Sequence, residues 1–206
     1  MRNGSRALAA VLAATAFFVP INSGFSAPAA PKAMITGAVT SQPIGHYEFC
    51  RSHRDECSVH GRVNAPAPRI TERGWSVLRD INLSVNASIT PMTDSDIYGR
   101  EEVWTYPTDV GDCEDFVLLK RKKLIEAGFD PSDLLITVVR KPDGEGHAVL
   151  TVRAAQGDYV LDNLNDEVKL WTATPYTYLK RQASFDSGRW VTIENGTTDL
   201  MVGALK

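Results

Sequence analysis

The order of two hydrophobic patterns constrains this fold more than any other feature of the sequence. In the first part of the chain, apolar residues recur at helical spacing in "ITERGWSVLRDINLSVNASI" and "CEDFVLLKRKKLIEAGF". In the last part they partly alternate within the short segments "DLLITVVR", "HAVLTVRA", "DYVLDNL" and "RWVTIE". Turn signals such as "PDGEG" and "AQGD" separate these segments. Helices followed by consecutive strands predict an α+β fold with an antiparallel sheet.

The two helical patterns have clear ends. The first begins after Thr71 and stops at "TPMTDSD", and residues 94–109 are predicted to be an irregular loop. The second begins at Asp112, which we expect to cap it, with two acids in its first turn, where the helix dipole favours negative charge. Gly128 follows the last turn and suits a left-handed stop.

The N-terminus predicts export. Arg2 and Arg6 precede the apolar run Leu8–Val19, which is too short to span a bilayer, and small residues follow it. A membrane anchor that is never cleaved is the alternative. The domain boundaries we expect are a signal peptide (1–27), a flexible linker (28–42), one domain (43–196) and a C-terminal tail (197–206).

The charge of the chain argues against one class of partner. The formal net charge is −3, and it becomes −5 once the two arginines of the signal peptide are removed. The sequence has no basic patch, so we expect no nucleic-acid partner.

The three cysteines differ in their surroundings. Cys50 and Cys57 lie close together in "FCRSHRDEC", and in an oxidising compartment such a pair is expected to form a disulfide. Cys113 then remains as a free thiol. The alternative for the first cluster is a metal site formed by Cys50, Cys57, His53 and His60.

Cys113 is the candidate nucleophile. His147 opens the second predicted strand and Asp162 ends the third. If Arg153 pairs with Asp158 across the intervening turn, His147 lies diagonally opposite Asp162 on the same face. A thiol at a helix N-terminus, with an imidazole and an orienting carboxylate, is the constellation of thiol catalysis. Each residue taken alone is more typical of a structural role.

The acids around Cys113 oppose a thiolate and need a further role. Asp112, Glu114 and Asp115 are more than helix capping requires, and a hard cation such as Ca²⁺ would account for the surplus. The alternative is a solvated acidic loop. Further acids that lie just upstream and are candidates to complete an oxygen shell are Asp94, Asp96, Glu101, Glu102 and Asp109.

Several motifs together resemble one family. "FCRSHRDEC", "YGREEVWTYPTDVGDCEDFVLLKRKKLIEAGF", "GEGHAVLTV" and "GDYVLDNL" are similar, in order, to motifs of the bacterial transglutaminase-like cysteine proteinases. The resemblance runs from about Gln42 to Glu194. It implies a papain-like transglutaminase core, with the nucleophile at a helix N-terminus packed on the antiparallel sheet.

The resemblance also implies roles for individual residues. Cys113 would be the nucleophile, His147 the general base and acid, and Asp162 the orienting acid. Calcium would be held by Asp112 and Glu114. The family further implies a periplasmic location, a protein substrate such as a secreted surface adhesin in biofilm release, and an inner-membrane regulatory receptor.

Three functions remain open from the sequence. The first is a periplasmic cysteine endopeptidase that acts through a thioester. The second is transglutaminase-type acyl transfer to an amine, since the same triad serves both reactions. The third is a non-catalytic periplasmic binding module. Trp104 is expected either to line the cleft and help the oxyanion hole or to be an ordinary buried aromatic residue.

Overall fold

The structure is a computed structural model that describes residue 1 and residues 32–63 and 65–196. The predicted signal peptide and C-terminal tail lie outside the described residues, apart from Met1. The helices are α1 (Ile44–Ser52), α2 (Glu72–Ser88), α3 (Asp94–Tyr98) and α4 (Cys113–Glu126), with 3-10 turns η1 (Arg54–Cys57), η2 (Pro131–Asp133) and η3 (Trp171–Ala173). In the part of the chain that the structure describes, no helix is long and apolar enough to cross a membrane.

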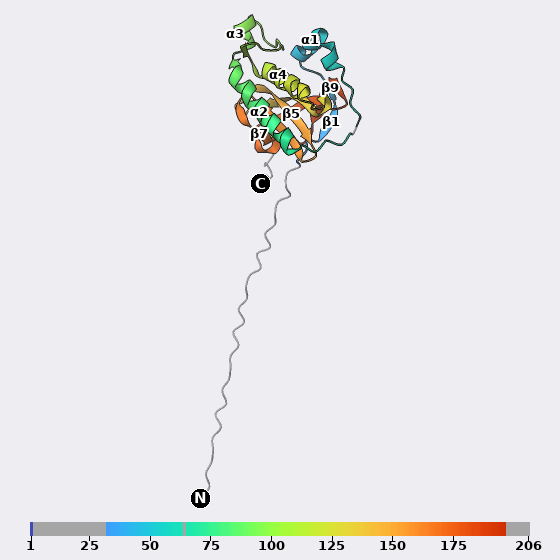
Figure 1. Cartoon of the computed structure of the whole chain (residues 1–206), viewed down its shortest axis with the longest axis vertical. Helices are drawn as coiled ribbons and strands as arrows, with labels where there is room; N and C mark the ends of the chain where they lie inside the picture. The colour runs from blue at the N-terminus through green and yellow to red at the C-terminus, as the bar shows by residue number, and fades with distance from the viewer. Residues whose placement is uncertain (2–31, 64, 197–206) are drawn as a thin grey trace, which may run out of the picture.

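A seven-stranded antiparallel sheet, in the order β1-β9-β8-β4-β5-β6-β7, forms the centre of the fold (Figure 1). Its strands are β1 (Thr36–Thr40), β4 (Leu134–Arg140), β5 (Gly146–Ala154), β6 (Gly157–Asp162), β7 (Asn165–Leu170), β8 (Thr177–Ala183) and β9 (Asp186–Ile193). A short parallel pair joins β2 (Thr90–Pro91) to β3 (Val110–Gly111). The α+β prediction, with helices before an antiparallel sheet, is confirmed.

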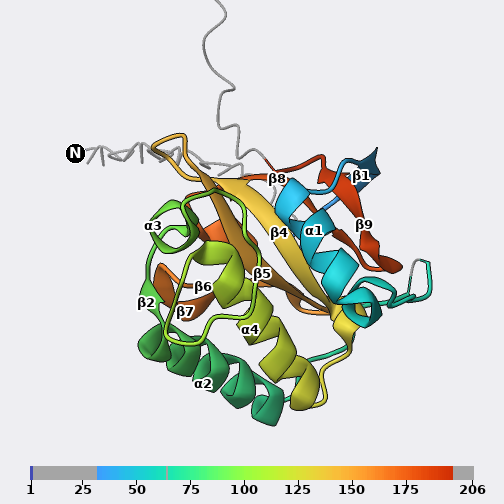
Figure 2. The same cartoon turned by 90° about the horizontal axis from the view of Figure 1, so that it is seen from above.

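Helices α2 and α4 pack against one face of the sheet (Figure 2). The core beneath them includes Leu78 and Leu124 from the helices and Leu150 from β5, all wholly buried. A second cluster, with Val149 and Val160, buries other side chains of the sheet. Neighbouring residues of β5 therefore belong to different clusters, as the period of two in a strand requires.

The ends of the helices follow local chemistry, with one exception. The Thr71 hydroxyl accepts from the Gly74 N–H at 3.1 Å and caps α2, and Gly128, with φ of 94°, follows the end of α4 as predicted. Asp112 stands at the N-cap of α4, but its side chain makes no capping hydrogen bond. The capping role expected for Asp112 is therefore wrong, and its carboxylate belongs to the acidic cluster described below.

Two segments differ from the sequence prediction. The loop expected over 94–109 begins with α3, because the Thr93 side chain caps it and Gly99, with φ of 68°, ends it. One short turn is too brief to show a hydrophobic period. The flexible linker expected over 28–42 contains β1, so that expectation is wrong for Thr36–Thr40. This segment forms a strand because it pairs with β9, and the local sequence gives no sign of that pairing.

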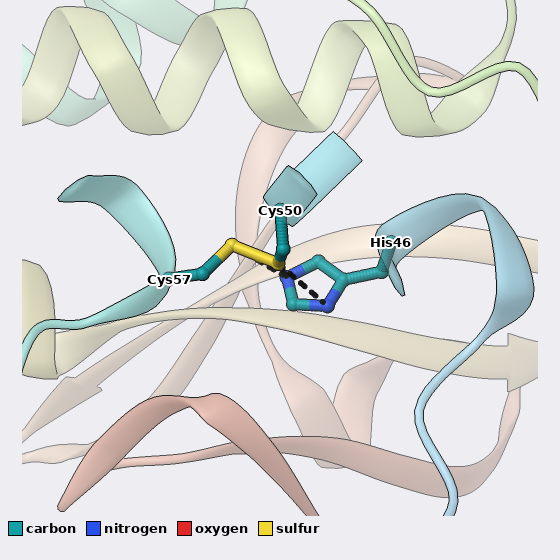
Figure 3. Close-up of side chains that lie close together, drawn as sticks. All are labelled: His46, Cys50 and Cys57. Atoms are coloured by element: carbon teal, nitrogen blue, oxygen red, sulfur yellow. Dashed lines mark hydrogen bonds between the residues drawn. A yellow bond between two sulfur atoms is a disulfide. The ribbon is translucent and has the colours of Figure 1, made fainter. Parts of the chain in front are cut away.

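The disulfide between Cys50 and Cys57 joins α1 to η1, as predicted, with 5.6 Å between the two Cα atoms. Figure 3 shows the ring of His46 beside it. Its Nδ1 lies 3.6 Å from the Cys50 sulfur. The alternative metal site is wrong, because both thiols are oxidised. Of its two histidines, His53 stacks on Phe49, and the exposed His60 lies near Asp186.

Removing this disulfide should destabilise the protein modestly. The loop that it closes is short, so the double variant Cys50→Ala/Cys57→Ala is expected to lose at most about 2–3 kcal/mol of unfolding free energy. Urea unfolding of the variant and the wild type measures the difference. A mass spectrum showing both thiols free in the oxidised, exported wild type would contradict the pairing.

Candidate active site

A cleft of about 500 Å³ brings together residues that lie far apart in the sequence. The lining side chains on which the site depends are Trp104, Asp112, Cys113, Glu114 and His147. A larger cavity, of about 590 Å³, lies between the start of α2 and the end of α4. The residues that line it include neither Cys113 nor His147, so we place the candidate active site in the smaller cleft.

Cys113 is the first residue of α4 and is half-buried. Its backbone N–H therefore has no acceptor within the helix. The sulfur accepts a hydrogen bond from the Ala148 N–H at 3.4 Å, so the thiol lies against the start of β5. The start of α4 and the start of β5 thus meet at the cleft, as the sequence predicts.

His147 and Asp162 are bonded to each other. Their atoms Nε2 and Oδ1 are 2.8 Å apart, and both side chains are buried. Arg153 pairs with Asp158, which is the register that places His147 diagonally from Asp162. The predicted carboxylate–imidazole pair is therefore formed, and one ring nitrogen is held by the carboxylate.

Asp162 accepts two further hydrogen bonds. The Tyr176 hydroxyl donates to Oδ2 at 2.5 Å, and the Leu164 N–H donates to Oδ1 at 3.0 Å. Burial raises the pKa of Asp162, but the bonds from His147, Tyr176 and Leu164 outweigh it and lower the pKa below its usual value. The sequence gives no sign of this role for Tyr176, because its partner Asp162 lies on another strand, β6.

The thiol of Cys113 is protonated in this arrangement. It donates to the Glu114 carboxylate at 3.0 Å. Burial, followed by the charge and hydrogen bond of Glu114, raises the pKa of the thiol well above its usual value. The acids beside Cys113 therefore oppose formation of a thiolate, and a nearby positive charge would be needed to reverse their effect.

Three acids form a compact cluster at the cleft, and two of them, Asp112 and Glu114, line it. Ligand oxygens of Asp94, Asp112 and Glu114 all lie within 4.8 Å of one another. Asp94 Oδ1 and Asp112 Oδ1 are buried without a hydrogen-bond partner among the described residues. Burial and the neighbouring carboxylates raise the pKa of Asp112, and burial raises that of Asp94. Asp94 belongs to α3, a helix that the sequence analysis did not predict.

Two other acids of this region, Asp115 and Glu102, lie outside the cluster. Asp115 accepts from the Thr105 N–H at 2.8 Å, and burial raises its pKa to about 7. Glu102 has a left-handed backbone, with φ of 59°, and accepts from Trp104 Nε1 at 3.2 Å. Trp104 is both buried and part of the cleft wall, and its N–H is bonded to Glu102.

One protein family matches most of the chain. The family described as "Bacterial transglutaminase-like cysteine proteinase BTLCP" matches residues 36–198. The search of curated proteins found no match for the chain.

Among solved structures, the chain is similar to LapG of Legionella pneumophila. The calcium-bound form is 24% identical, with a TM-score of 0.48, over 62% of this chain and 74% of that chain. A second LapG structure is 21% identical, with a TM-score of 0.49, over 73% and 81%. An EGTA-treated form is 21% identical, with a TM-score of 0.48, over 74% and 80%.

The substitution Tyr176→Phe should remove one of the hydrogen bonds that the Asp162 carboxylate accepts. A hydrogen bond to a charged group contributes about 1.5–3 kcal/mol, so we expect a loss of stability of that order at neutral pH. A carboxyl whose pKa is lowered by folding stabilises the protein above its unfolded pKa, and this contribution is lost as the pH falls through the folded value. The difference between variant and wild type should therefore shrink below about pH 4.

The matched control for this prediction is Tyr178→Phe. The Tyr178 hydroxyl bonds to the Thr174 hydroxyl, 2.7 Å away, and not to a carboxylate. Denaturant unfolding at several pH values compares the two variants. If both variants lose the same unfolding free energy at every pH, the Tyr176–Asp162 bond contributes no more than a bond between two neutral groups.

Proposed function

The chain belongs to the bacterial transglutaminase-like cysteine proteinase family, and we propose that it is an exported endopeptidase in which Cys113, His147 and Asp162 cleave a protein substrate. The observation that carries this proposal is the buried His147–Asp162 hydrogen bond of 2.8 Å, formed in the cleft that Cys113 enters from a helix N-terminus.

The proposed reaction divides between the three side chains. His147 takes the thiol proton, and the thiolate sulfur attacks the carbonyl carbon of the scissile peptide bond. The backbone N–H of Cys113, which has no intrahelical acceptor, would donate to the oxyanion. The amine leaves with the proton from His147, and a thioester remains on Cys113. His147 then draws a proton from water, which attacks the thioester and releases the acid.

Asp162 keeps the imidazole in position through this cycle. It holds Nε2 of His147, which leaves Nδ1 as the nitrogen that exchanges protons with the sulfur. The Tyr176 hydroxyl and the Leu164 N–H fix the carboxylate in turn. Trp104 serves as a wall of the cleft in this proposal, because its N–H is already bonded to Glu102.

We further propose that Asp94, Asp112 and Glu114 hold a calcium ion. The buried, unpartnered oxygens of Asp94 and Asp112 and the close approach of all three residues fit a hard cation with oxygen ligands. When bound, the ion supplies positive charge beside Cys113. Glu114, engaged as a ligand, would no longer hold the thiol proton, and His147 would face a thiol that ionises more readily.

We also propose the location, the substrate and the regulator of the protein. The predicted signal peptide (1–27) supports a periplasmic location. A secreted surface adhesin is the proposed substrate, and an inner-membrane receptor is the proposed regulator, on the strength of the family resemblance alone.

The triad is tested by three variants. Cys113→Ala should abolish cleavage, and His147→Ala should lower kcat by nearly as much, because the two residues act as one unit. Asp162→Asn should cost less, since the acid orients the ring. Cleavage of a periplasmic protein extract, read by mass spectrometry of new N-termini, supplies the assay. Normal cleavage by Cys113→Ala would refute the assignment.

An amine trap separates hydrolysis from acyl transfer. With a labelled primary amine present, a peptidase yields mainly free carboxylate, whereas a transglutaminase yields mainly the amide of the label. Rapid alkylation of Cys113 by iodoacetamide without any turnover on either route would favour the binding module.

The calcium proposal predicts a loss on chelation. At a free calcium concentration about a hundred times the Kd, the ion would add about 2.7 kcal/mol of stability. EGTA should then lower Tm by roughly 5–10 °C and reduce cleavage. Asp112→Ala should be insensitive to EGTA. Asp109 is exposed and does not belong to the acidic cluster, so Asp109→Ala should respond like the wild type. Calorimetry that detects no calcium uptake would exclude the site.

A further inference from the structure

The floor of the cleft contains a row of three residues on neighbouring strands. Ala148 of β5 pairs with Val138 of β4, and Val138 pairs in turn with Lys180 of β8. Residues that pair across antiparallel strands point to the same face of the sheet, and all three of these residues line the cleft. The row therefore crosses the sheet at right angles to its strands.

The two ends of this row differ in their chemistry. At one end the Ala148 N–H donates to the Cys113 sulfur at 3.4 Å, so this end lies at the candidate nucleophile. At the other end is Lys180, which is the one lysine or arginine among the described residues that line the cleft. Neighbouring strands are about 4.8 Å apart, so two strand spacings separate the ends by roughly 10 Å.

The cleft extends along the whole row. Asp112 and Cys113, at the start of α4, line it on one side, and Pro43 and the exposed Ile44, at the start of α1, line it on the other. Figure 2 shows the two helices on the same side of the sheet, with β4 between them. A peptide bound at Cys113 can therefore continue across β4 towards Lys180.

The ammonium of Lys180 is held in place but is not neutralised. Its Nζ donates to the Ser41 carbonyl at 2.8 Å, which accounts for one of its three N–H groups. It also lies 5.9 Å from the centroid of the Trp190 ring. Lys180 forms no ion pair with a carboxylate among the described residues. An ordered ammonium with N–H groups to spare is suited to bind a carboxylate from outside the chain.

The acids that share the cleft with Lys180 have other positions or partners. Asp112 and Glu114 belong to the proposed calcium site. Glu102 accepts a hydrogen bond from an indole N–H, and Glu101 is exposed at the rim. None of them lies within ion-pair distance of Lys180. The charge of Lys180 is therefore available to a bound peptide.

We propose that Lys180 is a specificity-determining residue, whose ammonium binds an acidic side chain of the peptide substrate about three residues from the scissile bond. An extended chain spans about 3.3 Å per residue, so roughly 10 Å from Cys113 corresponds to three residues. The inference rests on the proposed peptidase function, because it adds a substrate preference to the same cleft. A substrate with Asp or Glu at this position forms an ion pair with Lys180, whereas one with Asn or Gln does not.

A peptide library reads this preference without knowledge of the natural substrate. Periplasmic proteins digested with chymotrypsin and incubated with the wild type and calcium provide the peptides. Mass spectrometry of the new termini then gives the residues on both sides of each cleaved bond. Acidic residues should be enriched roughly threefold to fivefold at one position about three residues from that bond, as expected for a partly exposed ion pair.

Three variants assign the preference to one side chain. Lys180→Gln keeps an N–H donor for the Ser41 carbonyl but has no charge, so it should lose the enrichment. Lys180→Glu should select lysine and arginine at the same position instead. The control is Lys169→Gln. Lys169 lies on β7 of the same sheet, 3.5 Å from Glu167 and outside the cleft, so this variant should keep the enrichment.

A pair of synthetic peptides measures the size of the effect. The library peptide that is cleaved fastest is made with Asp and with Asn at the selected position. In the wild type, kcat/KM for the Asp peptide should exceed that for the Asn peptide roughly threefold to fivefold at low ionic strength. The ratio should approach one in about 1 M salt, where the Debye length is about 3 Å. In Lys180→Gln it should be close to one at every salt concentration.

Two kinds of failure are distinguishable. Cleavage by the wild type with no acidic preference at any position, or with the same preference in Lys180→Gln, would overturn the inference and leave the peptidase function intact. No cleavage of any peptide by the wild type would instead refute the peptidase function. Binding is measured separately with immobilised Cys113→Ala, which should retain acidic library peptides better than Cys113→Ala/Lys180→Gln does. Equal retention by the two proteins would also overturn the inference.

Discussion

The register of β5 against β6 is the constraint on which the candidate site depends. Pairing of Arg153 with Asp158 places His147 and Asp162 diagonally on one face, where they form a buried hydrogen bond. A shift of one residue would move one of the two side chains to the opposite face of the sheet. Packing of α4 against β5 then brings Cys113 to the same end of the sheet. A short turn between two strands thus sets the geometry of the proposed catalysis.

The second constraint on the site is the negative charge of the carboxylates near Cys113. The cleft collects carboxylates at the start of α4, and burial of Asp112 and Glu114 raises the pKa of each. Without a cation they hold the proton on Cys113. In our account, the positive charge that is needed beside the thiol comes from a bound ion.

The sequence predicts part of this arrangement because its patterns are local. Two amphipathic helices, four alternating strands and the close cysteine pair were all evident, and each is confirmed. Strands β1, β7 and β8 were missed, because their pairing partners, and not their own residues, determine them. The role of Tyr176 was missed for a related reason. A tyrosine after a loop carries no sign that tertiary packing will place its hydroxyl against Asp162.

The central claim is that Cys113 becomes a thiolate through His147 once the neighbouring acids are neutralised. The ultraviolet absorbance of the thiolate, followed as a function of pH with calcium and with EGTA, tests it most directly. We predict that, with calcium, Cys113 ionises well below the pKa of about 8.5 of an ordinary thiol, and that His147→Ala or EGTA reverses the shift. Ionisation at the same pH under all three conditions would contradict the account.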